Sequence, residues 1–246
     1  MSEGRLVARD VHVEFSGLRA LDGVTLDLAR GEIVGLIGPN GSGKTTLVNA
    51  ITCQVPLAGG EVTVDGVSMA GLKPSDVARH GIARSFQIVR LFDHLTVAEN
   101  IETAALAQGH GRRAAQAKVA ALLHDFGLDR HGDTLAAALN YGDKRRVEIA
   151  RALAAEPSFL ILDEPAAGMN EGESEVLLSL LAALPEKRRL GLLIIDHDMP
   201  LIMRLCHRLH VLASGRTIAE GDVESVRRHP AVIEAYLGSS AQAQHA

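Results

Sequence analysis

A glycine-rich loop between an apolar run and a helical pattern constrains the fold of this chain more than any other feature. The loop begins at Gly38 and reads G-P-N-G-S-G-K-T, which matches the phosphate-loop pattern G-x-x-x-x-G-K followed by Ser or Thr. Residues 33–37 before it are continuously apolar, as in a strand buried on both faces, and residues 45–52 after it have a helical pattern. This order of strand, loop and helix predicts an α/β fold with a parallel sheet.

The chemistry of this loop predicts that it binds a nucleoside triphosphate. Its glycines allow consecutive backbone N–H groups to surround an anion, and the helix after it directs its positive end at the same place. Lys44 would reach the β- and γ-phosphates, and the Thr45 hydroxyl would coordinate Mg²⁺. The expected nucleotide-binding residues of the loop are Gly38, Asn40, Gly41, Ser42, Gly43, Lys44, Thr45 and Thr46.

Two further apolar runs end in polar residues. Residues 159–162 lead into Asp163 and Glu164, and residues 192–195 are followed at the second position by His197. Because open α/β sheets bind their ligands at strand ends, we expect Asp163 to hold Mg²⁺ and Glu164 to polarise the attacking water as general base. His197 would bond the γ-phosphate. Taken alone, the acids are typical of an exposed turn and the histidine of a structural one, and the phosphate loop favours the functional interpretation.

The rest of the pattern predicts a sheet and an inserted helical region. Residues 6–15 and 24–28 alternate apolar and polar residues, as antiparallel strands with one buried face do, and residues 61–64 resemble another strand. Between residues 72 and 156, alanine, arginine and leucine predominate at helical spacing. The capping box Thr96-x-x-Glu99 predicts the start of one helix there.

A later helix is expected over residues 173–184, and Pro185 is expected to end it. Cys206, His207 and His210 are close enough in sequence to suggest a metal site. They adjoin an expected strand, where their side chains would diverge, so we disfavour this reading.

Composition excludes several classes of function. The chain of 246 residues has a formal net charge of −5 and only 3% aromatic residues, which disfavours a nucleic-acid-binding surface. Its first ten residues are polar and charged, so no signal peptide is visible. Its apolar runs are far shorter than the roughly 20 residues that span a bilayer. If the protein works at a membrane, we expect it to dock onto a protein that spans it.

With the phosphate loop, Gln87, the Asp163–Glu164 pair and His197 in this order, the chain resembles the ATP-binding subunits of ABC transporters. Within that superfamily it is similar to the LivG-type ATPases of branched-chain amino acid importers. The similar stretches are Gly81-Ile-Ala-Arg-Ser-Phe-Gln-Ile-Val-Arg-Leu-Phe, Tyr141-Gly-x-x-Arg-Arg-Val-Glu-Ile-Ala-Arg-Ala-Leu, Glu164-Pro-Ala-Ala-Gly-Met-Asn and Val232-Ile-x-x-Tyr-Leu-Gly.

The resemblance implies a P-loop NTPase fold of the ABC ATPase type, with a RecA-like parallel-sheet core, an antiparallel β subdomain and an inserted helical subdomain. The implied boundaries are 1–86 and 157–222 for the two parts of the ATP-binding core and 87–156 for the helical subdomain. A C-terminal helix and tail follow over 223–246. ATP and Mg²⁺ are the implied cofactors, and the metal ligands would be Thr45, Gln87 and Asp163. Lys44, Gln87, Glu164 and His197 would form the catalytic set, and Phe15 would stack on adenine.

The resemblance also implies a signature loop that acts in trans, on ATP held by a second ATPase subunit. Its residues here are Asn140, Tyr141, Gly142 and Asp143, and Gly142 would let the partner's nucleotide approach closely. The common pattern is Leu-Ser-Gly-Gly-Gln and the LivG-like form Leu-Ser-Tyr-Gly-Gln, so Asn140 replaces the serine and Asp143 the glutamine. The pair is expected to close a local helix cap. Asp143 would place a negative charge near the partner's phosphate and weaken the contact.

The implied partners are a second ABC ATPase subunit, identical or paralogous, integral membrane permease subunits and, indirectly, an extracytoplasmic solute-binding protein. Residues 88–100 would contribute to the groove that receives the permease, and Asn170 would lie at the dimer interface. The protein would be peripheral on the cytoplasmic face of the inner membrane, and cytoplasmic when free. Three alternatives stay open: an ATPase of a lipopolysaccharide-export system, a non-transport ABC ATPase, and a soluble P-loop kinase.

Overall fold

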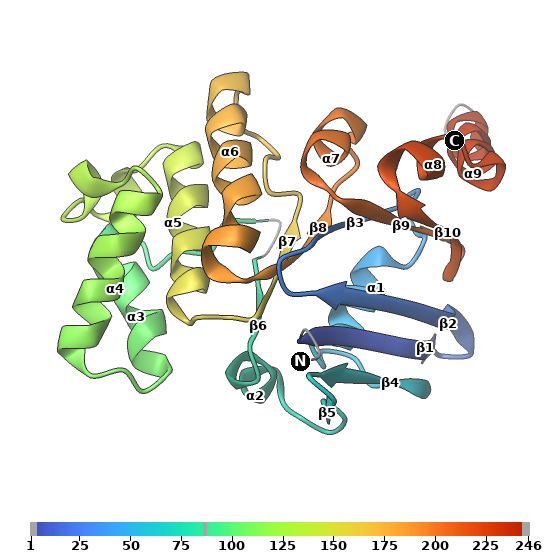
Figure 1. The fold of residues 1–246 in the computed structure, drawn as a ribbon, viewed down its shortest axis with the longest axis horizontal. Coiled ribbons are helices and arrows are strands. Elements are labelled where there is room, and N and C mark those ends of the chain that lie inside the picture. The colour runs from blue at the N-terminus through green and yellow to red at the C-terminus, as the bar shows by residue number, and fades with distance from the viewer. Residues whose placement is uncertain (1–3, 86–87, 243–246) are drawn as a thin grey trace.

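A computed structural model describes residues 4–85 and 88–242 of the chain (Figure 1). Two β-sheets form its framework. The first sheet is antiparallel, in the order β2-β1-β4-β5. Its strands are β1 (Arg5–Phe15), β2 (Leu18–Ala29), β4 (Gly59–Val64) and β5 (Val67–Ser68). They confirm the strands expected near the N-terminus, and the Cα register pairs Phe15 with Leu18 at the hairpin.

The second sheet has the order β10-β9-β3-β8-β7-β6, and its strands from β9 to β6 run parallel. Its strands are β3 (Ile33–Ile37), β6 (Ile82–Arg84), β7 (Phe159–Asp163), β8 (Gly191–Ile195), β9 (Arg208–Ala213) and β10 (Arg216–Asp222). The apolar runs identified in the sequence form β3, β7 and β8, as predicted. β6 adds an edge strand where the sequence suggested only helix, because its three residues are too few to give a period.

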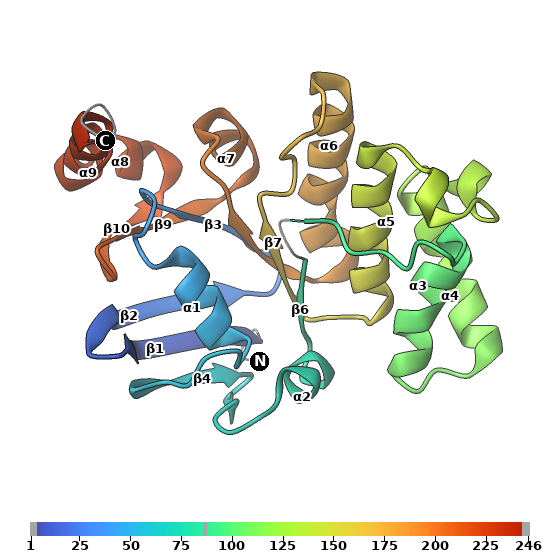
Figure 2. The same cartoon turned by 180° about the vertical axis from the view of Figure 1, so that it is seen from behind.

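Alternation along the parallel strands divides the core into two clusters. Side chains such as Val34 and Leu36 of β3 pack with the antiparallel sheet and with α1 (Lys44–Ile51). Their neighbours Ile33 and Ile37 pack on the other cluster with the remaining large helices. Because successive residues of a strand face opposite sides, one apolar run fills both clusters. The helix α1 thus lies between the two sheets (Figure 2).

Helices cover the second cluster. They are α3 (Val97–Ala107), α4 (Arg112–Asp125), α5 (Tyr141–Ala154), α6 (Glu171–Arg188), α7 (Met199–Leu205), α8 (Val223–Arg227) and α9 (Pro230–Gln242). Shorter elements are α2 (Pro74–Arg79) and two single turns of 3₁₀-helix, Asp129–His131 and Ala136–Ala138. The helices α3, α4 and α5 gather at one end of the molecule (Figure 1). The capping box at Thr96 is present and begins α3 as expected.

The prediction that Pro185 ends its helix is wrong. Helix α6 passes through Pro185 and ends at Arg188, where Arg189 adopts a left-handed conformation with φ of 50°. A proline removes one backbone N–H donor, and here only the last turn of the helix follows it. Pro185 and the preceding Leu184 are both buried against the core, and this packing holds the turn in place.

Candidate functional site: a nucleotide-binding and hydrolysis centre

The phosphate loop lies between β3 and α1, as the sequence predicts. Gly38 has φ of +150°, and a Cβ there would lie 2.1 Å from the carbonyl oxygen of Leu212, so no larger residue fits. Gly43 adopts a left-handed conformation as the N-cap of α1, which therefore begins at Lys44 with its free N–H groups directed at the loop. A hollow of about 410 Å³ opens over the loop.

The Lys44 side chain extends back across this loop. Its Nζ donates hydrogen bonds to the carbonyl oxygens of Gly38 at 2.7 Å and of Pro39 at 2.9 Å. Burial lowers the pKa of Lys44, while the nearby Asp163 and Glu164 carboxylates oppose that shift. The loop lysine and the two acids that follow β7 are therefore close enough to interact electrostatically, as a site for a phosphate anion and a cation requires.

Asp163 and Glu164 lie at the end of β7 in different local environments. Asp163 is the last residue of the strand, and Arg84 Nη2 lies 3.4 Å from its Oδ2. Glu164 has φ of 45°, a conformation that non-glycine residues adopt rarely. Its backbone N–H donates to the carbonyl oxygen of Ile195 at 2.7 Å, which joins the end of β7 to the end of β8. The Glu164 side chain is half-buried at this turn, with 24% of its surface exposed.

His197 lies beside that carboxylate, as predicted from its position after β8. Its Nδ1 is 3.3 Å from Glu164 Oε1, and its side chain is 77% exposed. The turn is fixed by the buried Asp196, whose Oδ1 accepts hydrogen bonds from the backbone N–H groups of His197 at 2.8 Å and Asp198 at 3.0 Å. Burial raises the pKa of Asp196, and those two N–H groups lower it in part.

The donors near the loop suit a magnesium ion. Thr45 offers an exposed hydroxyl in the first turn of α1, and Asp163 offers a carboxylate. Among the described residues no group of three His, Cys, Asp or Glu side chains could hold a metal ion. Mg²⁺ needs no such cage, because it is commonly bound by one or two carboxylates together with substrate phosphates. Gln87, the third predicted ligand and a predicted catalytic residue, lies outside the described residues.

Sequence reasoning missed part of the wall of this hollow. The wall includes Leu18, Arg19 and Ala20 of β2 and the turn of Ser214 and Gly215 after β9. The Ser-Gly pair predicts a turn, but nothing local indicates that the turn reaches the phosphate loop. Phe15, predicted to stack on adenine, is exposed at the end of β1 and pairs in register with Leu18. It is therefore beside the hollow and available to a ligand.

The signature loop begins helix α5. Asn140 is the N-cap: its Oδ1 accepts the backbone N–H of Asp143 at 2.8 Å, and its Nδ2 donates to Asp143 Oδ2 at 3.0 Å. Asp143 is only 7% exposed and also forms an ion pair with Arg146. The expected local cap is present. Arg146 pairs with this carboxylate within the chain, and the weaker contact that Asp143 is expected to cause at the partner's phosphate stays a prediction.

The close approach at Gly142 has a partner within its own chain. A Cβ on Gly142 would lie 2.7 Å from Glu173 Cδ, in the first turn of α6. Glu173 in turn forms a capping box with Asn170, the residue expected at the dimer interface. The Tyr141 ring similarly faces Gly168. The two loops expected to meet a second subunit therefore support one another.

A groove of about 700 Å³ lies between α2, β6, α3 and α5. Arg90, Leu91 and Phe92, which belong to the predicted docking segment 88–100, line this groove. The buried Asn100 holds this segment: its Oδ1 accepts the backbone N–H of Phe92 at 2.9 Å. The guanidinium of Arg151 lies 5.4 Å from the centre of the exposed Phe92 ring, within range of a cation–π contact.

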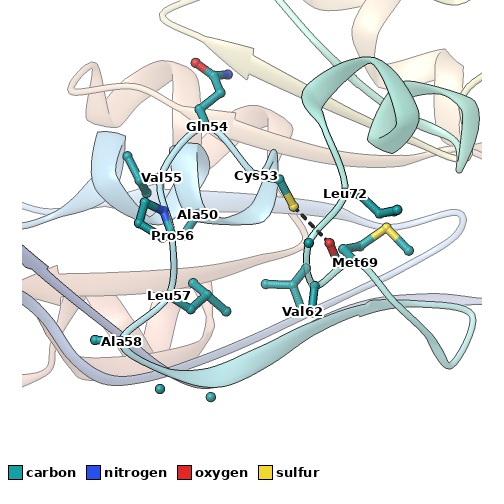
Figure 3. A pocket seen from close by; sticks show the side chains of 14 residues that line it. Ala50, Cys53, Gln54, Val55, Pro56, Leu57, Ala58, Val62, Met69 and Leu72 are labelled. Carbon is teal, nitrogen blue, oxygen red and sulfur yellow. Dashed lines mark hydrogen bonds between the residues drawn. The ribbon is translucent and has the colours of Figure 1, made fainter.

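A further hollow of about 590 Å³ lies at the opposite end of α1 from the phosphate loop (Figure 3). Its lining is mostly apolar, and the Cys53 thiol within it donates a hydrogen bond to the carbonyl oxygen of Met69 at 3.2 Å. Burial raises the pKa of Cys53, so its reactive thiolate form is disfavoured. This hollow lacks the charged groups that bind a phosphate.

Comparison with known proteins defines the class of the chain. The profile of the ABC transporter family matches residues 21–167, and that of the branched-chain amino acid ATP-binding cassette transporters matches residues 216–242. The chain therefore belongs to the ABC transporter ATP-binding family, and the prediction of an ATP-hydrolysing transporter subunit is confirmed. Within residues 4–85 and 88–242, no helix has the length and apolar character needed to cross a membrane.

The chain is 40% identical to the high-affinity branched-chain amino acid transport ATP-binding protein LivG of Salmonella typhimurium, over 98% of this chain and all of that protein. A cassette of an ABC transporter solved in its ADP conformation matches with a TM-score of 0.86 at 29% identity, covering 96% of this chain and all of the other. A dimeric cassette in a post-hydrolysis state, bound to ADP and Pi, matches with a TM-score of 0.77 at 26% identity over 89% and 98% of the two chains. These similarities confirm the predicted fold and favour the importer over the three alternatives.

Proposed function

We propose that this chain powers uptake of branched-chain or closely related amino acids through an ABC importer, by closing with a second ATPase subunit around two molecules of Mg-ATP. The arrangement that carries the proposal is the convergence of the phosphate loop, Asp163, Glu164 and His197 at one edge of the parallel sheet. Glu164 Oε1 lies 3.3 Å from His197 Nδ1, so a general base and its orienting group are already paired. The similarity to LivG supports the solute class.

Each residue of the proposed site has a separate role in ATP hydrolysis. The phosphate-loop N–H groups bind the β- and γ-phosphates, and Lys44 leaves its contacts with the loop carbonyls to pair with those phosphates. Glu164 accepts a proton from the attacking water, and His197 contacts the γ-phosphate and orients the Glu164 carboxylate. Mg²⁺, held by Thr45 and Asp163, would offset the charge that develops on the phosphate oxygens. Phe15 stacks on the adenine.

The transporter requires a second ATPase subunit, a permease and a solute-binding protein in addition to this chain. The signature loop contributes the N–H groups at the start of α5 to the ATP of the opposite subunit, an arrangement consistent with the dimeric cassette that the fold resembles. The permease docks in the groove beside Arg90, Leu91 and Phe92, which exposes an aromatic ring. A solute-binding protein outside the membrane delivers the amino acid. Residues 87–156 move as the helical subdomain that connects the groove to the signature loop.

Glu164→Gln tests the central assignment. We expect ATP turnover, measured as phosphate release by the full chain with Mg-ATP, to fall on the order of 10²–10⁴-fold. ATP binding should persist, and the variant should accumulate as a closed dimer on size-exclusion chromatography. Turnover near the wild-type rate would remove Glu164 from the mechanism. Uptake of labelled leucine by proteoliposomes that contain the permease tests the solute separately.

A further inference from the structure

A buried arginine of the signature helix lies directly behind the catalytic turn. Arg145 is 1% exposed, and no other fully buried side chain among the described residues is larger. Its Nη2 donates to the backbone carbonyl oxygens of Asp163 at 2.7 Å and Glu164 at 3.1 Å, and its Nε donates to that of Pro165 at 3.0 Å. One guanidinium therefore holds three consecutive carbonyls of the turn that carries the proposed general base.

Glu148, one turn further along α5, fixes the orientation of this guanidinium. Its Oε2 accepts a hydrogen bond from Arg145 Nη1 at 2.6 Å, and Glu148 is itself only 3% exposed. Its other oxygen, Oε1, lies 3.4 Å from the backbone nitrogen of Arg90, at the groove. The buried pair thus joins the groove, the signature helix and the catalytic turn through direct contacts.

The turn needs such support because its backbone is strained. Glu164 has φ of 45°, and conformations of this kind persist at functional sites only where the surroundings hold them. On one side, the carbonyl oxygen of Ile195 accepts the Glu164 N–H. On the other side, Arg145 holds the carbonyls. The direction of the Glu164 side chain follows from these restraints.

We propose that Arg145, oriented by Glu148, is a positioning residue for ATP hydrolysis: it fixes the backbone of Glu164 so that its carboxylate faces the attacking water. The inference rests on the proposed role of Glu164. A buried ion pair is weak evidence of a stabilising role, because an apolar pair of similar volume often serves stability equally well. The bonds from Arg145 to three carbonyls of one functional turn point to geometry as the reason for this pair.

The test replaces both partners at once, so that no unpaired charge is buried. We expect the full chain with Arg145→Met and Glu148→Leu to remain folded, to bind ATP with a Kd within about threefold of wild type, and to lose at least tenfold in kcat with little change in KM. Arg145→Lys can reach fewer carbonyls, so its kcat should lie between that of the wild type and that of the double variant. The matched control, Arg188→Met with Asp125→Leu, removes an ion pair between α6 and α4 that does not touch the turn, and should keep the wild-type kcat.

Combination with Glu164→Gln separates a positioning role from general damage. If Arg145 acts through Glu164, the double replacement should lower turnover little further in the Glu164→Gln background. A wild-type kcat for the double replacement, or an equal loss in both backgrounds, would overturn the inference. If Glu164→Gln alone leaves turnover unchanged, the proposed function of Glu164 fails, and that result is distinct from a failure of Arg145.

Discussion

Replacing Asn100 with aspartate tests how the groove segment is held. The Asn100 side chain is fully buried, and its Oδ1 accepts the Phe92 N–H. Its Nδ2 donates to the carbonyl oxygens of Phe92 at 3.0 Å, Leu95 at 3.3 Å and Thr96 at 2.9 Å. Asn100→Asp keeps the size of the side chain and the oxygen that accepts the Phe92 N–H. It replaces the amide nitrogen with an oxygen that faces three carbonyl oxygens.

The cost of this change depends on pH. An ionised carboxylate there would be desolvated and repelled, so the folded protein should hold the new carboxyl group protonated. Keeping a proton on an aspartate whose unfolded pKa is near 3.9 costs about 4 kcal/mol at pH 7 and about 2 kcal/mol at pH 5.5. Because the folded pKa is raised, the penalty grows as pH rises through that range and is absent below about pH 4.

Thermal unfolding followed by circular dichroism measures this penalty. About 1 kcal/mol corresponds to roughly 2–4 °C in a chain of this size, so the Tm should fall by about 8–16 °C at pH 7 and by about half as much at pH 5.5. Asn170→Asp is the matched control, since Asn170 caps α6 by accepting the Glu173 N–H at 2.9 Å and aspartate caps equally well. The reasoning is refuted if Asn100→Asp melts within about 2 °C of wild type at both pH values.

Three further predictions follow from other parts of the structure. Burial raises the pKa of Cys206 to about 12, so at pH 8 iodoacetamide should label it only when the protein is unfolded; rapid labelling of the native chain, read by mass spectrometry, would contradict this burial. Asn140→Ser with Asp143→Gln should raise ATP turnover of the transporter about two- to fivefold if the signature loop acts in trans, and an unchanged rate would show that both replacements are harmless. Burial raises the pKa of Tyr236 and the backbone of Gly38 opposes that shift, so Tyr236 lies near the phosphate loop. Tyr236→Phe should therefore raise KM for ATP by roughly two- to tenfold at constant kcat in steady-state kinetics, whereas an unchanged KM would separate α9 from the phosphate loop.

The parts of the site that the sequence predicted are those fixed by local backbone geometry. A phosphate loop needs its glycines and lysine at set spacings, and parallel strands bring their carboxyl ends to one edge of the sheet. Glu164 and His197, 33 residues apart, could therefore be placed together before their 3.3 Å contact was known. The helix start at Thr96 followed from the same kind of local rule.

The parts that the sequence did not predict depend on contacts between distant segments. Gly215 lines the nucleotide hollow because β9 pairs beside β3, and no pattern near Gly215 indicates that pairing. Nothing in the sequence near Arg145 indicates that it is buried, whereas the fold buries it behind β7. Proline has a low intrinsic preference for helix, so the sequence predicts that α6 ends before Pro185. The packing of buried Leu184 and Pro185 overrides that preference.

Contacts within the chain hold the backbone of the signature loop, in which Asn140 and Asp143 replace the common residues. Gly142 and Tyr141 pack against Glu173 and Gly168, so the backbone at the start of α5 must keep its shape even before a second subunit arrives. Asn140 is a strong N-cap, and its side chain forms hydrogen bonds with the backbone N–H and the carboxylate of Asp143 in the first turn of the helix. Because this cap already engages the Asp143 N–H, the loop holds its backbone conformation within its own chain. A contact with the partner's ATP would then depend on the other N–H groups of the first turn.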